Sequence, residues 1–237
     1  EGDRGRINAE QVSANINSRS DAHLPYTSLV CLEDTANKGG GAVYDHNEIK
    51  KIAEVCRKNN LMLHLDGARV FNALAVTGMT PSAYAEPFDS ISICLSKGLG
   101  APVGSVLLGS REFIQKAHRV RKVMGGGMRQ AGIIAAGAIH ALDHHLPLLS
   151  EDHRRARIIG DALSRLPWVK DVMPVETNIV IFSLHPGKTS ADGIKALAES
   201  DIHCFAFGPD KIRFVTHLDF KEEHLSHLLN KLTQVQF

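Results

Sequence analysis

Residues 90–109 read SISICLSKGLGAPVGSVLLG, in which two apolar runs flank a turn that contains Lys97. The runs over residues 91–95 and 103–108 predict β-strands, because each is short, apolar nearly throughout and bounded by polar residues or glycine. A dinucleotide-binding fingerprint is disfavoured at the G-x-G of this turn, since a strand follows where that motif requires a helix. The stretch therefore predicts two strands joined by a loop that carries a lysine.

Upstream, two further strands are separated by a helix. Residues 28–33 (SLVCLE) and 61–66 (LMLHLD) are short apolar runs that end in an acid, which is typical of buried strands. Between them, Asp45 and Glu48 have the spacing of a capping box at a helix start, and Asn59-Asn60 predicts the helix end. The apolar positions of this helix share one face, which is expected to lie in the core: Ile49, Ile52, Ala53 and Cys56.

Downstream, Ser110 predicts the N-cap of a helix that runs to about Lys122, and a long helix is expected over residues 128–145, after Gly125-Gly126-Gly127. Strands that alternate with helices and are apolar nearly throughout are typical of a mainly parallel α/β sheet. Both helices are expected to place apolar residues inside: Phe113, Ile114 and Ala117 in the first, and Ile133, Ile134, Ala138, Ala141 and Leu142 in the second.

Pro147 interrupts the long helix, and the pattern changes beyond it. The elements expected there are helices over 151–166, 190–200 and 222–235 and strands over 178–184, 202–207 and 211–216. Their order is typical of a small α+β unit. We therefore expect a domain boundary near residue 147, with a large domain over 1–147 and a small C-terminal domain over 148–237.

The composition indicates a globular protein. The 237 residues are 43% hydrophobic and 22% charged, which excludes a disordered chain, collagen and coiled coil. The formal net charge of +1 gives no electrostatic footprint for nucleic acid or an anionic membrane, and no apolar run reaches the length of a membrane span. Four separated cysteines without a C-x-x-C pair indicate reduced, buried thiols, as in a cytoplasmic protein.

Two polar side chains follow predicted strands, where open α/β sheets bind ligands. A buried acid at Asp66 is costly unless it pairs with a cationic group, and the alternative is that it caps the next helix or pairs with Arg69. At Lys97, partial desolvation would lower the pKa of the amine and make it a nucleophile or a Schiff-base former. The alternative there is a solvated loop lysine.

A third candidate is Arg213, which alternates with apolar neighbours in the expected strand of residues 211–216. Its guanidinium either grips a ligand carboxylate bidentately or points to solvent from an edge strand. His140 and His144 have the i, i+4 spacing of metal ligands, but no third ligand is evident and no metal is expected. The sequence contains no G-x-S-x-G elbow, so a serine hydrolase has no support.

Four stretches together resemble the low-specificity L-threonine aldolases, which are fold-type I pyridoxal-phosphate enzymes: HLDGARVFNA, SICLSKGLGAPVGSVLLGS, VRKVMGGGMRQAGIIAA and RFVTHLDF. The resemblance implies a transferase-like α/β large domain over residues 1–147, here incomplete, and a small C-terminal α+β domain. The family's N-terminal portion, with a Gly/Thr phosphate-binding turn and a histidine that stacks on the cofactor, has no counterpart in this sequence. We therefore expect the chain to be the C-terminal part of a longer enzyme.

The resemblance also implies roles for individual residues. Lys97 would form a Schiff base with pyridoxal 5'-phosphate, and Asp66 would pair with the protonated pyridine nitrogen. Arg213 would bind the substrate carboxylate, and Arg69 would contribute to cofactor and substrate binding. Three further assignments are His23 near the substrate β-hydroxyl, Arg129 toward the cofactor phosphate and Lys122 toward the substrate, the last two beside a Gly-rich turn that reaches a neighbouring subunit's site.

The reaction implied is the aldol cleavage of L-threonine or L-allo-threonine to glycine and acetaldehyde, a step of threonine catabolism and glycine formation. His23, a bound water and a residue outside the chain compete as the base that takes the β-hydroxyl proton. The family often has E-N-T-H-N where this chain has residues 33–37, EDTAN, so Ala36 does not inherit the task of that histidine. The resemblance further implies a homotetramer built from dimers with shared active sites.

Two other hypotheses stand beside the aldolase. The first is another fold-type I activity, such as a β-eliminating lyase or an aminotransferase, which the extended match from Lys97 through GGGMRQ disfavours. The second is a non-catalytic fragment or pseudoenzyme that acts only as a partner subunit. The presence of Lys97, Asp66 and Arg213 disfavours that reading.

Overall fold

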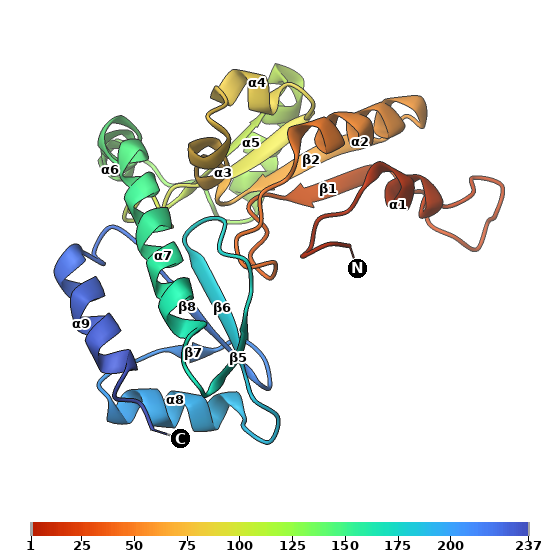
Figure 1. The fold of residues 1–237 in the computed structure, drawn as a ribbon. Helices are drawn as coiled ribbons and strands as arrows, with labels where there is room; N and C mark the ends of the chain where they lie inside the picture. Colours follow the sequence, from red (N-terminus) through yellow and green to blue (C-terminus); the bar gives the residue numbers. More distant parts are fainter. Residues whose placement is uncertain (1, 237) are drawn as a thin grey trace. The chain divides into compact units, whose positions relative to one another are not determined.

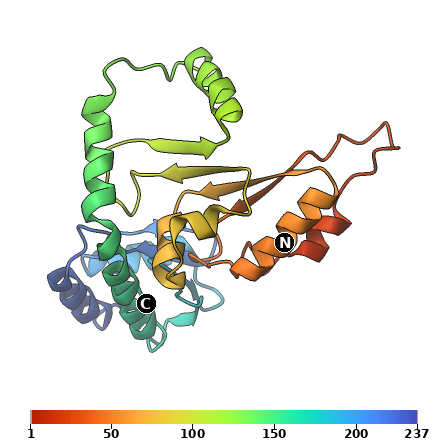
Figure 2. The same cartoon turned by 90° about the horizontal axis from the view of Figure 1, so that it is seen from above.

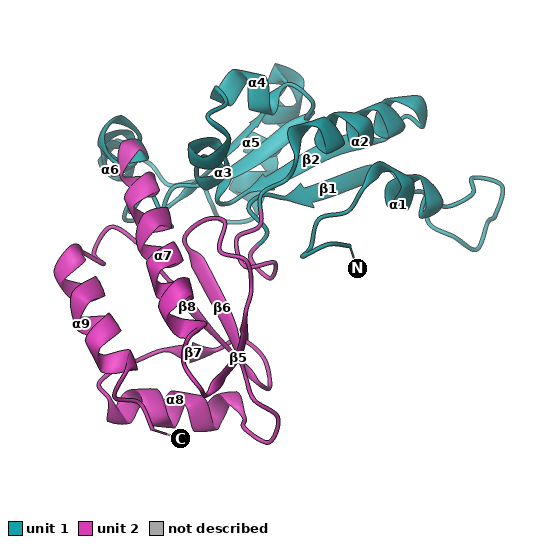
Figure 3. Ribbon diagram, in the orientation of Figure 1, with its two compact units in different colours: residues 1–36, 43–146 teal, residues 37–42, 147–237 magenta. Residues whose placement is uncertain are grey.

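The computed structural model describes residues 2–236, which divide into two compact units (Figure 3). The first unit comprises Glu1–Ala36 and Val43–Leu146, and the second comprises Asn37–Ala42 and Pro147–Phe237. The chain thus leaves the first unit briefly after Ala36 and returns at Val43. The sequence pattern did not predict that residues 37–42 belong to the second unit.

Unit 1 is built on a four-stranded sheet with the order β1-β2-β3-β4 (Figure 1). Its strands are β1 (Leu29–Glu33), β2 (Met62–Gly67), β3 (Ser90–Cys94) and β4 (Ser105–Gly109). The first three run parallel, and β4 runs antiparallel to β3 at the edge of the sheet. The expected mainly parallel α/β sheet is therefore confirmed, with one antiparallel edge strand.

The helices of unit 1 are α1 (Ala9–Ala14), α2 (His46–Lys58), α3 (Val70–Thr77), α4 (Pro81–Ala85), α5 (Arg111–Val123) and α6 (Gly132–His144). The apolar stripe expected on α2 is confirmed, because its four residues are all at most 1% exposed. The sequence analysis missed α1, α3 and α4, which are short. The periodicity of a helix of eight residues or fewer is too brief to stand out from its surroundings.

The capping box expected at α2 forms only in part. Asp45 is the N-cap, and its carboxylate accepts a hydrogen bond from the Asn47 N–H at 3.0 Å. The Glu48 carboxylate does not return to Asp45, because it accepts from the Ala9 N–H at 2.9 Å and from Lys51 at 3.0 Å. Glu48 therefore joins α2 to the start of α1 instead of closing its own helix cap.

The elements after β3 are much more exposed than the sequence predicts. In the described chain, every residue of β4 is exposed and no residue of α5 is buried, although Ser110 caps α5 as expected. In α6 only Ala141 is buried, and Ile133 is 79% exposed. The predicted interiors of both helices are wrong for this chain except at Ala141, because α5 packs only in part, against β4, and most of the apolar face of each helix stays uncovered in the described chain.

Unit 2 contains an antiparallel sheet with the order β5-β6-β8-β7. Its strands are β5 (Val169–Val172), β6 (Ile179–Leu184), β7 (Phe205–Ala206) and β8 (Lys211–Val215), and its helices are α7 (Leu149–Leu163), α8 (Ser190–Glu199) and α9 (Glu222–Leu232). A 3₁₀ turn at Leu146–Leu148 precedes α7. The sequence analysis missed β5 and expected a longer β7, but the small α+β unit is as expected.

The core of unit 2 lies between its sheet and its helices. Every residue of β6 is buried, and Phe182 packs edge-on against Trp168 and Phe214 with ring centroids 5.9 and 5.3 Å away. Of the four cysteines, all free, only Cys56 is buried, and Cys31 is exposed, so the prediction of buried thiols is wrong for most of them. Among the residues described, helices lack the combined length and apolar character needed to cross a bilayer.

Burial shifts the pKa values of two adjacent groups on α7 in opposite directions. Burial raises the pKa of the Asp152 carboxyl to about 6, although the nearby Arg155 charge acts against this shift. Burial lowers the pKa of His153 to about 4, and the Arg157 charge adds to the effect. As the pH rises from about 4 to about 6, Asp152 therefore destabilises the fold while His153 stabilises it, and the two effects partly cancel.

The variant Asp152→Asn is expected to remove this cancellation. Only the His153 contribution then remains, so the free energy of unfolding should rise between pH 4 and pH 6.5 by about 1 to 2 kcal/mol more than in the wild type. Urea unfolding at a series of pH values measures this difference. Asp161→Asn, on the exposed side of the same helix, is the matched control, and equal pH slopes in all three proteins would contradict the prediction.

Candidate active site

Asp66 and Lys97 lie at the same edge of the sheet of unit 1. Asp66 is opposite Ser92 in the parallel register of β2 and β3, and Lys97 follows the last residue of β3 by three positions. The loop after β3 is closed by hydrogen bonds from the Gly100 N–H to the Lys97 carbonyl at 2.8 Å and from the Ala101 N–H to the Leu95 carbonyl at 3.0 Å. A carboxylate and an amine thus stand at the carboxyl ends of adjacent strands, where open α/β sheets bind ligands.

The Asp66 carboxylate is half-buried and structures the turn that follows β2. Its Oδ1 accepts a hydrogen bond from the Ala68 N–H at 3.1 Å, just before α3 begins at Val70. This is close to the capping role considered as the alternative for Asp66. It uses one carboxylate oxygen and leaves Oδ2 for another partner, so the capping and ligand-binding roles are compatible.

Lys97 is exposed, which contradicts the partial desolvation expected from the sequence. The reason is local, because residues 96 and 97 stand in the turn beyond β3 and not in the strand itself. The Lys97 charge acts on Cys94 in the preceding strand. Burial opposes ionisation of the Cys94 thiol, but hydrogen bonds with Ser96 and the Lys97 charge outweigh this effect and lower the pKa of the thiol.

A buried polar pair lies beside this edge and was missed by the sequence analysis. Asp34 follows β1, and its N–H donates to the Asp66 carbonyl at 3.0 Å. The Asp34 carboxylate, which is fully buried, accepts a hydrogen bond from the Tyr84 hydroxyl. Burial, followed by the Asp34 charge, raises the pKa of Tyr84 well above its ordinary range. The pair fixes the chain where it leaves unit 1.

Three of the expected site residues do not reach this edge within the chain. His23 lies in the loop between α1 and β1, which leads into the amino end of the strand, opposite the edge with Asp66 and Lys97. Lys122 is on the last turn of α5, and Arg129 is in the connection to α6. Figure 2 shows this connection standing apart from the strands. Arg69 directly precedes α3 and is close in sequence to Asp66.

Arg213 is not on an edge strand, which corrects one of the two readings of the sequence. It lies in β8, between β6 and β7, opposite Ile181 on one side and Phe205 on the other. Its side chain is half-buried, and its Nη1 donates to the Asn37 Oδ1 at 2.8 Å. The guanidinium carbon also lies 4.9 Å from the centre of the Phe207 ring. Asn37 is a contact that the sequence analysis did not find.

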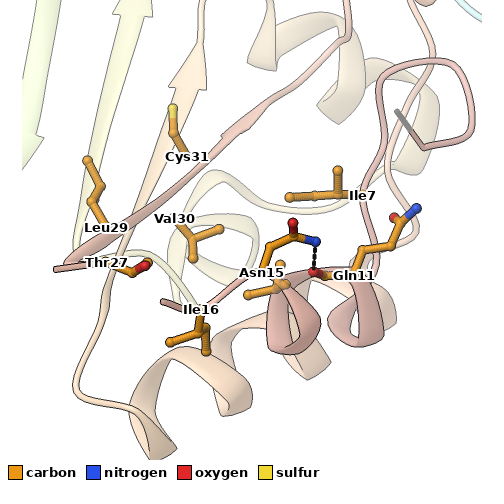
Figure 4. A pocket seen from close by; sticks show the side chains of 9 residues that line it. Ile7, Gln11, Asn15, Ile16, Thr27, Leu29, Val30 and Cys31 are labelled. Carbon is orange, nitrogen blue, oxygen red and sulfur yellow. Dashed lines mark hydrogen bonds between the residues drawn. The ribbon is translucent and has the colours of Figure 1, made fainter. Parts of the chain in front are cut away.

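Two other features offer no chemistry. A pocket of about 480 Å³ lies between α1 and β1 (Figure 4), but Cys31 is its only ionisable side chain, and its polar side chains bond to the backbone, as the Asn15 amide does to the Gln11 carbonyl. His140 and His144 stack with ring centroids 4.4 Å apart. Across residues 2–236, the structure shows no group of three or more His, Cys, Asp or Glu side chains that could hold a metal ion.

Comparison with known proteins assigns the chain to a family. The sequence profile described as beta-eliminating lyase matches residues 1–186, which include both Asp66 and Lys97. The chain belongs to the beta-eliminating lyase family. The matched range includes all four strands of the sheet of unit 1.

The resemblance to low-specificity L-threonine aldolases is confirmed by individual relatives. The chain is 37% identical over 230 residues to a probable low-specificity L-threonine aldolase 2 of Arabidopsis thaliana, which covers 95% of this chain. It is 38% identical over 224 residues to the low specificity L-threonine aldolase of Escherichia coli K12, which covers 94% of it. The chain spans 65% of the length of each of these two relatives.

Solved structures show the same fold. A threonine aldolase of Leishmania major matches with a TM-score of 0.81 at 20% identity, over 98% of this chain and 68% of that one. An aspartate aminotransferase of Rhizobium meliloti matches with a TM-score of 0.66 at 19% identity, over 97% of this chain and 61% of that one. The fold is that of the fold-type I pyridoxal-phosphate enzymes, as expected from the sequence.

Proposed function

We propose that the protein cleaves L-threonine or L-allo-threonine to glycine and acetaldehyde with pyridoxal 5'-phosphate as cofactor. One observation carries the proposal: Asp66 and Lys97 occupy neighbouring strand ends in a chain that is 37% identical to a probable threonine aldolase over 95% of its length. An aldolase and an aminotransferase both match this fold, so the fold does not identify the substrate. The substrate is inferred from the sequence match.

The donor set at this edge fits pyridoxal phosphate. An accessible primary amine is what an aldehyde requires, and Lys97 provides one because it is exposed. A carboxylate with a free oxygen is what a protonated pyridine nitrogen requires, and Asp66 uses only Oδ1 in its turn. When bound, the cofactor would act as the electron sink for the bond that breaks at the substrate Cα.

The chain's own residues would then have distinct tasks. Lys97 would hold the cofactor covalently, and Asp66 would keep a proton on the ring nitrogen. Arg213 would bind the substrate carboxylate and so fix which bond at Cα is presented for cleavage. Arg69, close in sequence to Asp66, would add positive charge for the cofactor and the substrate. His23 lies at the other end of β1, so a bound water or a residue outside the chain is proposed as the base that takes the β-hydroxyl proton.

We further propose that the active protein is a homo-oligomer built from dimers. Exposed apolar side chains gather on α5 and on the connection to α6, with Val123 78% and Met124 81% exposed, and surfaces of this kind are typical of interfaces. Lys122 and Arg129 lie on the same stretch. In an oligomer they would serve a neighbouring subunit's site, Arg129 toward the cofactor phosphate and Lys122 toward the substrate.

The proposal is tested with the full-length protein that contains this chain. It is loaded with pyridoxal phosphate, its mass is measured by light scattering, and glycine and acetaldehyde are quantified after addition of L-threonine or L-allo-threonine. We expect the two products in equal amounts from an oligomer. A cofactor-loaded protein that releases no acetaldehyde would exclude the aldolase. Release of pyruvate and ammonia from an amino acid would instead support a β-eliminating lyase.

A further inference from the structure

The carboxyl end of α6 contacts the loop that carries Lys97. The Nδ1 atom of His145, the C-cap of α6, lies 2.6 Å from the Leu99 carbonyl oxygen. A carbonyl oxygen only accepts hydrogen bonds, so Nδ1 must carry a hydrogen and donate it. The His140 ring stands perpendicular to the His145 ring, with centroids 5.2 Å apart. His145 is half-buried and Leu99 is buried, so water competes little for this bond.

The peptide that links Leu99 to Gly100 is held at both of its polar groups. Its carbonyl accepts from His145, and its N–H, which belongs to Gly100, donates to the Lys97 carbonyl at 2.8 Å. A peptide unit is planar, so fixing the carbonyl also fixes the direction of the N–H. Gly100 has a φ of +69°, which a residue with a side chain rarely adopts. His145 therefore acts on the backbone of Lys97 through a single rigid peptide.

Small residues bring α6 close to this loop (Figure 2). Gly137, Ala141 and His145 follow one another at intervals of four residues and so share one face of the helix. A Cβ on Gly137 would lie 2.8 Å from the Pro102 Cδ, and Ala141 is fully buried. The helix backbone can therefore approach the loop closely enough for the His145 ring to reach the Leu99 carbonyl.

We propose that His145 is a positioning residue for Lys97, because its Nδ1 fixes the Leu99–Gly100 peptide and thereby the place of the lysine at the carboxyl end of β3. The inference rests on the proposed function, in which Lys97 bonds to the cofactor aldehyde. Lys97 is exposed, so its side chain gains no support from burial and its backbone is the part that the fold holds. An amine on a fixed backbone meets an aldehyde in the reactive orientation more often than one on a mobile loop.

The contact is tested first in the cofactor-free full-length protein, by hydrogen exchange of the Gly100 N–H. Asparagine places an amide N–H where histidine has Nδ1, whereas glutamine places it where histidine has Nε2, so the two variants identify the ring nitrogen that acts. We expect exchange to rise about tenfold in His145→Ala and His145→Gln and to stay near the wild-type rate in His145→Asn. His144→Ala, at the exposed neighbouring position, is the matched control.

The same proteins are then mixed with pyridoxal phosphate, and the rate at which Lys97 becomes linked to the cofactor is measured by borohydride reduction and mass spectrometry. This rate should fall about tenfold in His145→Ala and His145→Gln and less than about threefold in His145→Asn. With L-threonine, kcat should fall with the linkage rate while KM changes less than about threefold, because Arg213, which would bind the substrate carboxylate, lies in unit 2. A general defect of the fold would not distinguish asparagine from glutamine.

The outcomes are distinct. If His145→Ala does not fold, Gly137→Ala pushes α6 away from Pro102 and should raise the exchange rate of the Gly100 N–H about threefold. Equal exchange rates in His145→Asn and His145→Gln would overturn the inference and leave the proposed function standing. The expected exchange and linkage rates in a protein that releases no acetaldehyde would support the inference and reject the aldolase. A wild type whose Lys97 does not become linked to the cofactor would overturn both.

Discussion

Replacement of Lys97 by alanine is expected to reduce acetaldehyde release from L-threonine by at least about 1,000-fold. The amine is the one group of the proposed site that would bond to the cofactor, and no other side chain of the described loop after β3 could replace it. Because Lys97 is exposed beyond the strand, its removal deletes no buried contact. The loss should therefore appear in kcat, without a change in the thermal unfolding midpoint of the cofactor-free protein.

The covalent link gives this prediction a second measurement. Borohydride reduction of the cofactor-loaded wild type should leave the cofactor attached, as a label, to the peptide that contains Lys97. Mass spectrometry identifies that peptide. Lys58→Ala, at the exposed end of α2, is the control and should retain both label and activity. A label on another lysine, or a Lys97→Ala protein that still forms acetaldehyde at the wild-type rate, would show that the nucleophile has been misassigned.

Elements with long, regular patterns were predictable from the sequence. The stripe on α2 and alternate residues of β1 and β2 are buried within the unit, so local periodicity carries enough information. The same reasoning located α5 but misjudged its burial. An apolar face indicates that something covers it, and it does not tell whether the cover comes from the same chain. Val123 and Met124 show the difference.

The site was predictable where it depends on strand ends and not where it depends on distant contacts. Asp66 and Lys97 follow apolar runs, and the carboxyl ends of parallel strands necessarily meet at one edge. Asn37 gave no signal, because its partner Arg213 is far along the chain and the two meet only through the short excursion of residues 37–42. His23 was assigned by resemblance, and the strand direction places it at the opposite edge.

Asp66→Asn is expected to keep the cofactor bound while lowering kcat about 100-fold. The two side chains have the same shape, so the asparagine Oδ1 can still accept from the Ala68 N–H and preserve the turn. What is lost is the negative charge that would hold the proton on the ring nitrogen. An ionic partner that acts mainly as charge develops in the transition state contributes more to kcat than to substrate binding. Each tenfold loss of kcat corresponds to about 1.4 kcal/mol of activation free energy.

The measurement compares kcat, KM and bound cofactor in three proteins. Asp45→Asn is the matched control, because asparagine caps a helix about as well as aspartate and Asp45 is the N-cap of α2 in the same unit. The control should match the wild type in every quantity. In Asp66→Asn, KM for L-threonine should change little and the label on Lys97 should persist. An unchanged kcat would remove Asp66 from the site, whereas loss of the cofactor would show that its carboxylate acts in binding and not in the chemical step.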